Sequence, residues 1–327
     1  MKGLILSGGS GRRLRPLTHT SAKQLVPIAN VPILHYVVAD LVGVGITDIG
    51  IVVGDTGDEV RASVGDGSRW GASVTYIDQA APLGLAHAVR VAEEFLGDEP
   101  FAMYLGDNMF EDSLDEVVDG FDGSVAARLL LARVDDPSSF GVAELASDGS
   151  IAALFEKPVD PPSDLALVGV YLFGPRIHEA VRAIEPSARG ELEITDAIQW
   201  LLDSGETVEH RVLDGWWIDT GKKDPLLACN RLVLDRLGGD GVVVDDGAEV
   251  VDSTLIPHCG VLVVAGVINP TGNGAKIVDG PCAPTETEVG KGGEHPIFPD
   301  CSPQYARAIL GPDCDDALIV DIKGLRP

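Results

Sequence analysis

Short apolar runs that alternate with stretches of helical spacing constrain this chain more than any other feature of its sequence. Apolar runs of strand length occur at residues 3–6, 49–53, 74–77 and 101–105. Stretches with helical spacing lie between them, at residues 31–44, 59–64 and 85–96. This alternation of strand and helix predicts a mainly parallel sheet that is covered by helices on both faces, which is an α/β fold.

The pattern changes twice further along the chain. Residues 125–173 are rich in strand-like runs, and we expect them to form an insertion that builds one wall of a pocket. Helical spacing then returns at residues 176–184, 194–202 and 226–237. We therefore predict a Rossmann-like catalytic domain over residues 1–237.

The remaining residues, 238–327, have a different character. Apolar side chains recur at intervals of six, the period of a left-handed β-helix, at Val244, Val250, Ile256, Leu262 and Ile268. The repeat is lost after Asn269 among glycines and prolines. We expect a small β-rich, diverged hexapeptide-like C-terminal region, which a degenerate left-handed β-helix would explain.

The net charge narrows the set of partners. The chain has 24 Lys and Arg against 51 Asp and Glu, which gives a net charge of −27. Such an acidic surface repels phosphate backbones and anionic lipids, so we expect neither nucleic acid nor a membrane as a partner. No apolar run approaches the roughly 18 residues of a membrane span, and no secretory signal is evident at the N-terminus. These features predict a cytoplasmic protein.

A glycine-rich loop follows the first predicted strand, with the sequence SGGSGRRLRP at residues 7–16. Glycines at the carboxyl end of a first strand let backbone N–H groups close around a phosphate. The loop lacks the Gly-Lys-Ser/Thr of a Walker A motif, and Pro16 disfavours a dinucleotide fingerprint. The arginines, with Lys23 and Gln24 shortly after, suit a bound triphosphate. A tight turn with exposed arginines explains the loop equally well.

Carboxylates and a lysine stand at the ends of three other predicted strands. Asp107 follows the strand at 101–105, and Asp219 lies in WIDTG. Two such carboxylates suffice for Mg²⁺, although each also suits a turn. In FEKP, Lys157 could bind a phosphate and Glu156 could accept from a sugar hydroxyl, unless this segment is simply an exposed strand end.

A series of segments, in order, resembles the sugar nucleotidyltransferases, and among them the long form of the glucose-1-phosphate thymidylyltransferases. The resemblance covers about residues 1–236. The matching segments are residues 8–18, 23–27, Gln79 with 82–87, 105–108, 155–158, 168–171, 190–196 and 217–221. One motif alone would be weak support, whereas several in the right order are specific.

The resemblance implies that a sugar 1-phosphate attacks the α-phosphate of a nucleoside triphosphate and releases pyrophosphate. Arg13 and Lys23 would be the catalytic cations, and Asp107 and Asp219 would ligate Mg²⁺. The implied nucleotide-binding residues are Gly8, Gly9, Gly11, Gln24, Gln79, Gly84 and Leu85. The implied sugar-phosphate residues are Glu156, Lys157, Gly169 and Glu191.

The substrates that we expect are dTTP and glucose 1-phosphate, and the product dTDP-glucose. UTP is the alternative, because the thymine methyl adds only one apolar contact. A catalytically weak nucleotide-sugar-binding regulator is a second alternative, and its only support is the altered loop and the diverged tail. Arg12 and Val31 stand where the family usually has threonine and lysine. We expect a homo-oligomer, and we expect His87 to be a solvated first-turn residue without a catalytic role.

Overall fold

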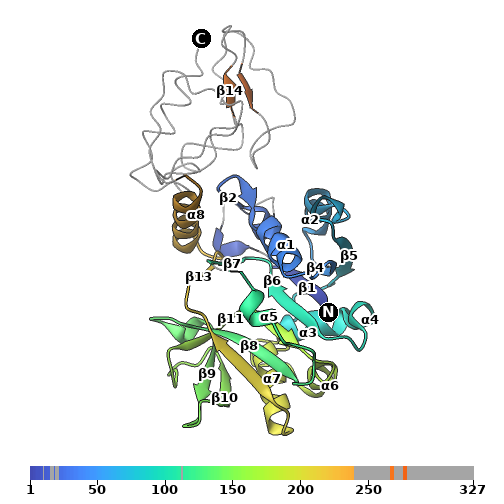
Figure 1. Ribbon diagram of the computed structural model, residues 1–327, viewed down its shortest axis with the longest axis vertical. Helices are drawn as coiled ribbons and strands as arrows, with labels where there is room; N and C mark the ends of the chain where they lie inside the picture. The colour runs from blue at the N-terminus through green and yellow to red at the C-terminus, as the bar shows by residue number, and fades with distance from the viewer. Residues whose placement is uncertain are drawn as a thin grey trace. The chain divides into compact units, whose positions relative to one another are not determined.

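The computed structural model describes residues 1–9, 11–14, 18, 22–111, 113–238, 266–268 and 275–277 (Figure 1). The chain divides into two compact units. The first unit contains residues 1–10 and 33–219, and the second contains residues 11–32 and 220–327. Among the described residues, no helix combines the length and apolar character that a membrane span requires.

A nine-stranded sheet organises the first unit. Its main path runs β10-β9-β11-β6-β1-β4-β5, with β8 beside β11 and β12 beside β8. Four neighbouring strands are parallel: β6 (Phe101–Leu105), β1 (Lys2–Ser7), β4 (Asp48–Val53) and β5 (Ser73–Asp78). The alternation of strands and helices in the sequence correctly predicted this Rossmann-like α/β fold.

The antiparallel strands account for the strand-rich stretch that interrupts the alternation. They are β8 (Ala127–Arg133), β9 (Gly141–Leu145), β10 (Ile151–Glu156) and β11 (Leu165–Phe173). β11 pairs antiparallel with β6 and so joins this part to the parallel strands. The edge strand β12 (Val208–Val212) pairs parallel with β8. The predicted insertion at 125–173 is therefore an extension of the central sheet.

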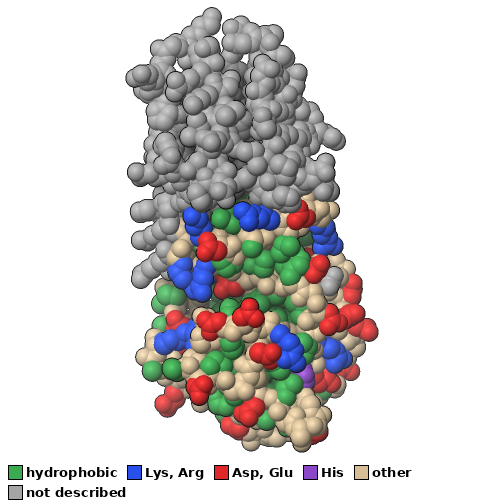
Figure 2. All heavy atoms as spheres, turned by 90° about the vertical axis from the view of Figure 1, so that its left-hand side faces the viewer, with side chains coloured by type: hydrophobic (Ala, Val, Ile, Leu, Met, Phe, Trp, Pro, Cys, Tyr) green, Lys and Arg blue, Asp and Glu red, His purple; other side chains and the backbone are tan. Residues whose placement is uncertain are grey.

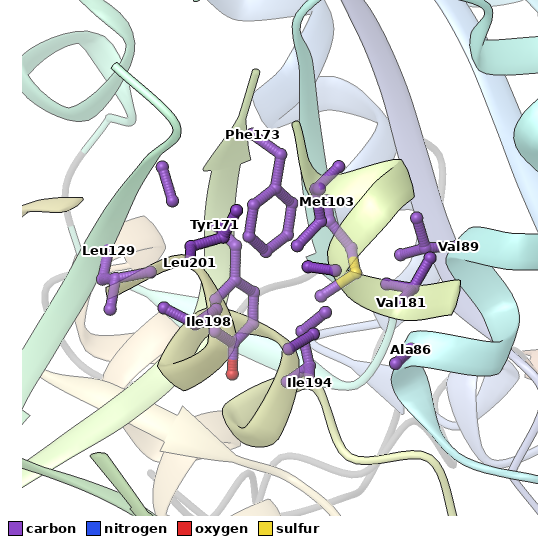
Figure 3. Close-up of a cluster of buried hydrophobic side chains, with 14 of the residues drawn as sticks. Ala86, Val89, Met103, Leu129, Tyr171, Phe173, Val181, Ile194, Ile198 and Leu201 are labelled. Atoms are coloured by element: carbon purple, nitrogen blue, oxygen red, sulfur yellow. The ribbon is translucent and has the colours of Figure 1, made fainter. Parts of the chain in front are cut away.

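Helices cover both faces of the sheet. Successive side chains of β1 point to opposite faces, and those on each face pack against helices. Leu4 and Leu6 belong to a buried cluster with α3 (Leu85–Val91), α6 (Ile177–Ala183) and α7 (Ile194–Asp203). In Figure 3, Tyr171 and Phe173 of β11 stack within this cluster, with ring centroids 5.9 Å apart. On the other face, α1 (Ile33–Gly43) contacts β1, and the Tyr104 hydroxyl donates to Asp40 Oδ2 at 2.9 Å.

Several predicted helices differ from the structure at their ends, and two of them differ for a visible reason. The stretch 85–96 forms two helices, α3 and α4 (Glu93–Leu96), which are separated at Ala92. The helix expected from residue 31 begins at Ile33, because Val31–Pro32 forms strand β3 and pairs with β2 (Pro27–Ile28). Ala29 and Asn30 both have positive φ, at 45° and 70°, as a tight two-residue hairpin turn requires.

The remaining elements are short or belong to the second unit. In the first unit they are α2 (Gly57–Val64), η3 (Ser68–Trp70), β7 (Asn108–Phe110), α5 (Asp115–Val118), η4 (Pro137–Ser139) and β13 (Trp217–Asp219). The second unit contains η1 (Arg12–Leu14), η2 (Lys23–Leu25), the β2–β3 hairpin, α8 (Lys223–Gly238) and a β14–β15 ribbon (Gly266–Ile268 with Ala275–Ile277).

One side-chain contact fixes the hairpin of the second unit. The backbone N–H of Ala29 donates to Asn230 Oδ1 of α8 at 2.8 Å. Most of the predicted six-residue repeat, from Val244 to Leu262, lies outside the described residues. The β-rich region over 238–327 and its boundary therefore stay predictions.

Gly174 offers a test of the packing beyond the end of β11. A Cβ added there would lie 2.9 Å from the Val125 carbonyl oxygen and 3.0 Å from that of Gly123, and backbone cannot move aside cheaply. We expect Gly174→Ala to lower the free energy of unfolding by about 1–3 kcal/mol. Gly43→Ala is the matched control, because nothing lies within 4 Å of its added methyl group. Urea unfolding checks both, and equal stability of the two variants would contradict the packing described here.

Candidate active site

The first group of candidate residues lies in the loops that follow the parallel strands. Since β6, β1, β4 and β5 run parallel, their carboxyl ends lie at one edge of the sheet. Gly8 and Gly9 follow β1, Gln79 follows β5, and Asp107 lies just beyond β6. Ligands of open α/β sheets bind outside this edge. The fold therefore places residues from three predicted motifs at one location.

Gly8 and Gln79 are in direct proximity. A Cβ added at Gly8 would lie 3.3 Å from Gln79 Oε1, so the glycine leaves space beside the amide. Gln79 Nε2 donates to the carbonyl oxygen of Gly84 at 3.3 Å and lies 2.9 Å from His87 Nδ1. His87 is half-buried, and this contact places its ring beside Gln79.

Gly84 holds the loop before α3 close to a distant segment. Its φ is +104°, and an added Cβ would lie 2.3 Å from the Leu192 carbonyl oxygen. The Leu192 N–H donates to the Leu83 carbonyl oxygen at 2.7 Å, and the Ala86 N–H donates to that of Leu192 at 3.0 Å. Only glycine fits this approach. The loop that leads to Leu85 is thereby bonded to the segment that carries Glu191.

The pairing of β7 with β13 places one candidate metal ligand opposite the neighbour of the other. Asp219 ends β13 directly opposite Asn108, which is the neighbour of Asp107. Asn108 Nδ2 donates to Asp107 Oδ1 at 3.2 Å, and its Oδ1 accepts from Trp217 Nε1 at 2.6 Å. Through these two bonds, Asn108 connects Asp107 to Trp217 of β13.

Asp107 and Asp219 are the candidate metal ligands, and a Mg²⁺ ion takes one or two carboxylates and completes its shell with water and phosphate oxygens. Among the described residues, no group of three or more His, Cys, Asp or Glu side chains suits a metal ion. Asp107 is nearly buried, with 8% of its surface exposed. A site of this kind would depend on oxygen atoms that the substrate supplies.

Gly169 of β11 lies against the same ribbon. A Cβ added there would lie 2.5 Å from Asn108 Oδ1 and 3.0 Å from Leu105 Cβ. Any larger residue would therefore displace Asn108 from its place beside Asp107. This contact connects the predicted sugar-phosphate residue Gly169 to the predicted metal ligands.

Glu156 is the centre of a network of charged and polar side chains. Its Oε1 accepts from Arg189 Nη2 at 2.8 Å and lies 3.2 Å from Lys157 Nζ. Its Oε2 accepts from the Thr195 hydroxyl at 2.7 Å. Gly141 lies beside it, since an added Cβ would be 3.0 Å from Thr195 Oγ1. Lys157 has a φ of +43°, which is uncommon for a residue with a side chain.

Arg189 connects Glu156 to further carboxylates. Its Nη2 lies 2.8 Å from Glu193 Oε1 and 3.8 Å from Glu191 Oε2. Burial raises the pKa of Asp196, and the charges of Glu193 and Glu156 raise it further. The guanidinium thus offsets a concentration of negative charge at this position.

Sequence reasoning missed Arg189, Thr195 and Asn108 as members of the site. All three lie within or next to matching segments, because Arg189 precedes Gly190 and the other two belong to quoted motifs. Their positions in those motifs were the available signal. Nothing in the sequence distinguishes them from their neighbours, since their roles are contacts to residues far along the chain.

The other candidate residues belong to the second unit. Arg13 is exposed in η1, and Lys23 is half-buried at the start of η2. Gln24 is buried, and its Oε1 has no hydrogen-bond partner within the described residues. Gly11 has a φ of +56°, and its carbonyl oxygen accepts from the Thr18 hydroxyl at 2.6 Å. The glycine is thus required by the turn itself.

The described surface carries both signs of charge. Figure 2 shows Asp and Glu side chains spread over this face, with Lys and Arg side chains among them. No continuous basic surface is visible on the part of this face that the structure describes. This distribution agrees with the negative net charge of the chain.

Known proteins resemble the chain over most of its length. The family model described as nucleotidyl transferase matches residues 2–236. Glucose-1-phosphate thymidylyltransferase from Streptomyces antibioticus is 54% identical over 271 residues, covering 78% of this chain and 76% of the relative. The enzyme of that name from Streptomyces griseus is 52% identical over 278 residues, covering 84% and 78%.

Solved structures agree in fold. A Bacillus anthracis protein, whose crystal structure is a complex with sucrose, has a TM-score of 0.67 and 38% identity over 71% of this chain and 94% of its own. A UDP-glucose pyrophosphorylase complexed with UDP-glucose has a TM-score of 0.64 at 24% identity, covering 72% and 98%, and shares the fold. The resemblance seen in the sequence motifs is confirmed, and the chain belongs to the nucleotidyl transferase family.

Proposed function

We propose that the protein transfers a thymidylyl group from dTTP to glucose 1-phosphate and forms dTDP-glucose and pyrophosphate. The observation that carries this proposal is the junction at Leu192, which bonds the loop beside Gln79 to the segment of the Glu156 network. The segment with the proposed base-reading residue is thereby bonded to the segment of the proposed sugar-phosphate residues. The names of the two Streptomyces relatives support the choice of substrates.

The proposed reaction needs no nucleophilic side chain. A phosphate oxygen of glucose 1-phosphate attacks the α-phosphorus of dTTP, the bond to the β-phosphate breaks, and pyrophosphate leaves. Catalysis then consists of alignment and of neutralising the charge that develops on the leaving group. Arg13 and Lys23 are the proposed cations for the triphosphate, with backbone N–H groups of Gly8, Gly9 and Gly11 as further donors.

Asp107 and Asp219 are the proposed ligands of Mg²⁺. When bound, the ion would neutralise phosphate charge and orient the reacting groups. The pairing of β7 with β13 supports this proposal, because it sets Asp219 opposite Asn108, the neighbour of Asp107. Asn108 supports this arrangement through its hydrogen bonds to Asp107 and Trp217.

The sugar phosphate is assigned to the Glu156 network. Arg189 and Thr195 hold the Glu156 carboxylate in one orientation, in which it can accept from a sugar hydroxyl. Lys157 is the proposed phosphate ligand, and its left-handed backbone costs of order 1–3 kcal/mol, as is common at ligand-binding positions. Gly169 and Glu191 would line the same site.

Pyrophosphate release tests the proposed reaction. With Mg²⁺ and glucose 1-phosphate, we expect release to be strongest with dTTP among dTTP, UTP, ATP, CTP and GTP. A preference for UTP would change the base and keep the chemistry. Folded protein that binds a nucleotide sugar but releases no pyrophosphate with any triphosphate would contradict the proposed reaction. It would favour a regulatory function instead.

Replacement of Asp107 tests the metal assignment. We expect Asp107→Ala to lower kcat by roughly 1,000-fold or more, because one of two metal ligands is lost. The melting temperature should stay close to that of the unchanged protein. Asp148→Ala is the control, since Asp148 lies in an exposed turn beside Ser150. Turnover near the normal rate in folded Asp107→Ala protein would refute the assignment.

Lys157→Met tests the division between the two substrates. Loss of a charged phosphate contact should raise the KM for glucose 1-phosphate by roughly 10- to 100-fold and leave the KM for dTTP nearly unchanged. Arg133→Met is the control, because Arg133 pairs with Asp164 on the surface at 2.6 Å. An effect confined to dTTP would mean that Lys157 serves the triphosphate instead.

A further inference from the structure

The amide of Gln79 is fixed in one of its two possible orientations. Its Nε2 lies 3.3 Å from the carbonyl oxygen of Gly84, and a carbonyl oxygen can only accept a hydrogen bond. The NH₂ group must therefore face Gly84, since the opposite orientation would set two acceptors against each other. The same nitrogen lies 2.9 Å from His87 Nδ1.

His87 acts as an acceptor in this contact. Gln79 Nε2 carries only donors, so a hydrogen bond at 2.9 Å requires an unprotonated Nδ1. Burial lowers the pKa of His87, and the charge of Arg90 lowers it further, so the imidazole is neutral at neutral pH. The two N–H groups of Gln79 are then both used, one by Gly84 and one by His87.

The remaining polar atom of the amide, Oε1, is directed toward the glycine-rich loop. A Cβ at Gly8 would lie 3.3 Å from it, and within the described part of the chain no group donates to it. Gln79 thus presents an acceptor and no donor to that side. Thymine and uracil carry an N3–H donor, whereas N3 of cytosine is an acceptor. The fixed amide matches the first two bases and opposes the third.

We propose that His87 is a positioning residue that, together with the Gly84 carbonyl oxygen, holds the amide of Gln79 with its oxygen toward the nucleotide and so contributes to the base specificity of the site. This inference rests on the proposed function, in which Gln79 reads the base. His87 does not touch the substrate itself. In its acceptor tautomer it takes the second N–H of Gln79, while the Gly84 carbonyl oxygen disfavours the flipped amide, whose NH₂ group would donate to N3 of cytosine.

Two variants of His87 separate this role from a general structural one. His87→Leu introduces an apolar side chain of similar size and removes the acceptor. His87→Asn keeps an acceptor, because its Oδ1 can occupy the position of Nδ1. For each protein, kcat/KM is measured with dTTP and with dCTP at saturating glucose 1-phosphate. Dissociation constants for both nucleotides are measured by calorimetry.

We expect His87→Leu to lower the preference for dTTP over dCTP by about 5- to 10-fold, which corresponds to one hydrogen bond. The change should appear in KM and in the dissociation constant, with kcat for dTTP nearly unchanged. His87→Asn should restore the preference to within about 3-fold of the original value. An unchanged preference in His87→Leu, or an equal loss in both variants, would overturn the proposal.

Binding data distinguish this inference from the proposed reaction. Folded protein that binds dTTP in preference to dCTP but releases no pyrophosphate would refute the reaction, and the comparison of His87 variants would then use dissociation constants. Protein that binds both nucleotides equally well would overturn the role of His87, whatever its turnover.

Discussion

The parallel pairing of β1 with both β4 and β6 is the constraint on which the rest of the structure depends. Gly3 pairs with Ile49 on one side and with Ala102 on the other, and this register continues to the end of β1. Apolar side chains on both faces of β1 are buried, so a shift by one residue would exchange the two faces. The same register determines which loops meet at the carboxyl edge, and hence where Gly8 lies relative to Gln79.

The sequence was informative wherever function follows from position along a strand. Asp107 and Gln79 could be placed because each stands just beyond an apolar run, and the parallel fold brings such positions to one edge. The contacts of Arg189 with Glu156 and of Gly84 with Leu192 join distant segments, and no local pattern encodes them. A homo-oligomeric state and a cytoplasmic location stay predictions, because they are properties beyond the fold of one chain.

Acidity poses a particular problem for a protein that we propose to bind two anionic substrates. Lys157 and Arg189 already contact Glu156, so an incoming phosphate would compete with a carboxylate for both cations. The cost is modest for Lys157, because its own side chain is exposed and surface ion pairs contribute only about 0–1 kcal/mol. Arg189 contacts two carboxylates at 2.8 Å and is better suited to hold Glu156 than to leave it. Lys157 is therefore the candidate phosphate ligand, and Arg189 is the side chain that holds Glu156 in place.

Base recognition in the proposed site relies on neutral groups instead. Gln79, His87 and the Gly84 carbonyl oxygen carry no net charge, so their interaction with a base is little affected by the triphosphate or by salt. A neutral amide has two orientations of similar shape, and a second group must choose between them. The Gly84 carbonyl oxygen makes that choice, and His87 of α3, the helix whose preceding loop is bonded to Leu192, takes the second N–H of the amide. The orientation of the amide and the position of the sugar-phosphate segment therefore depend on the same short stretch of backbone.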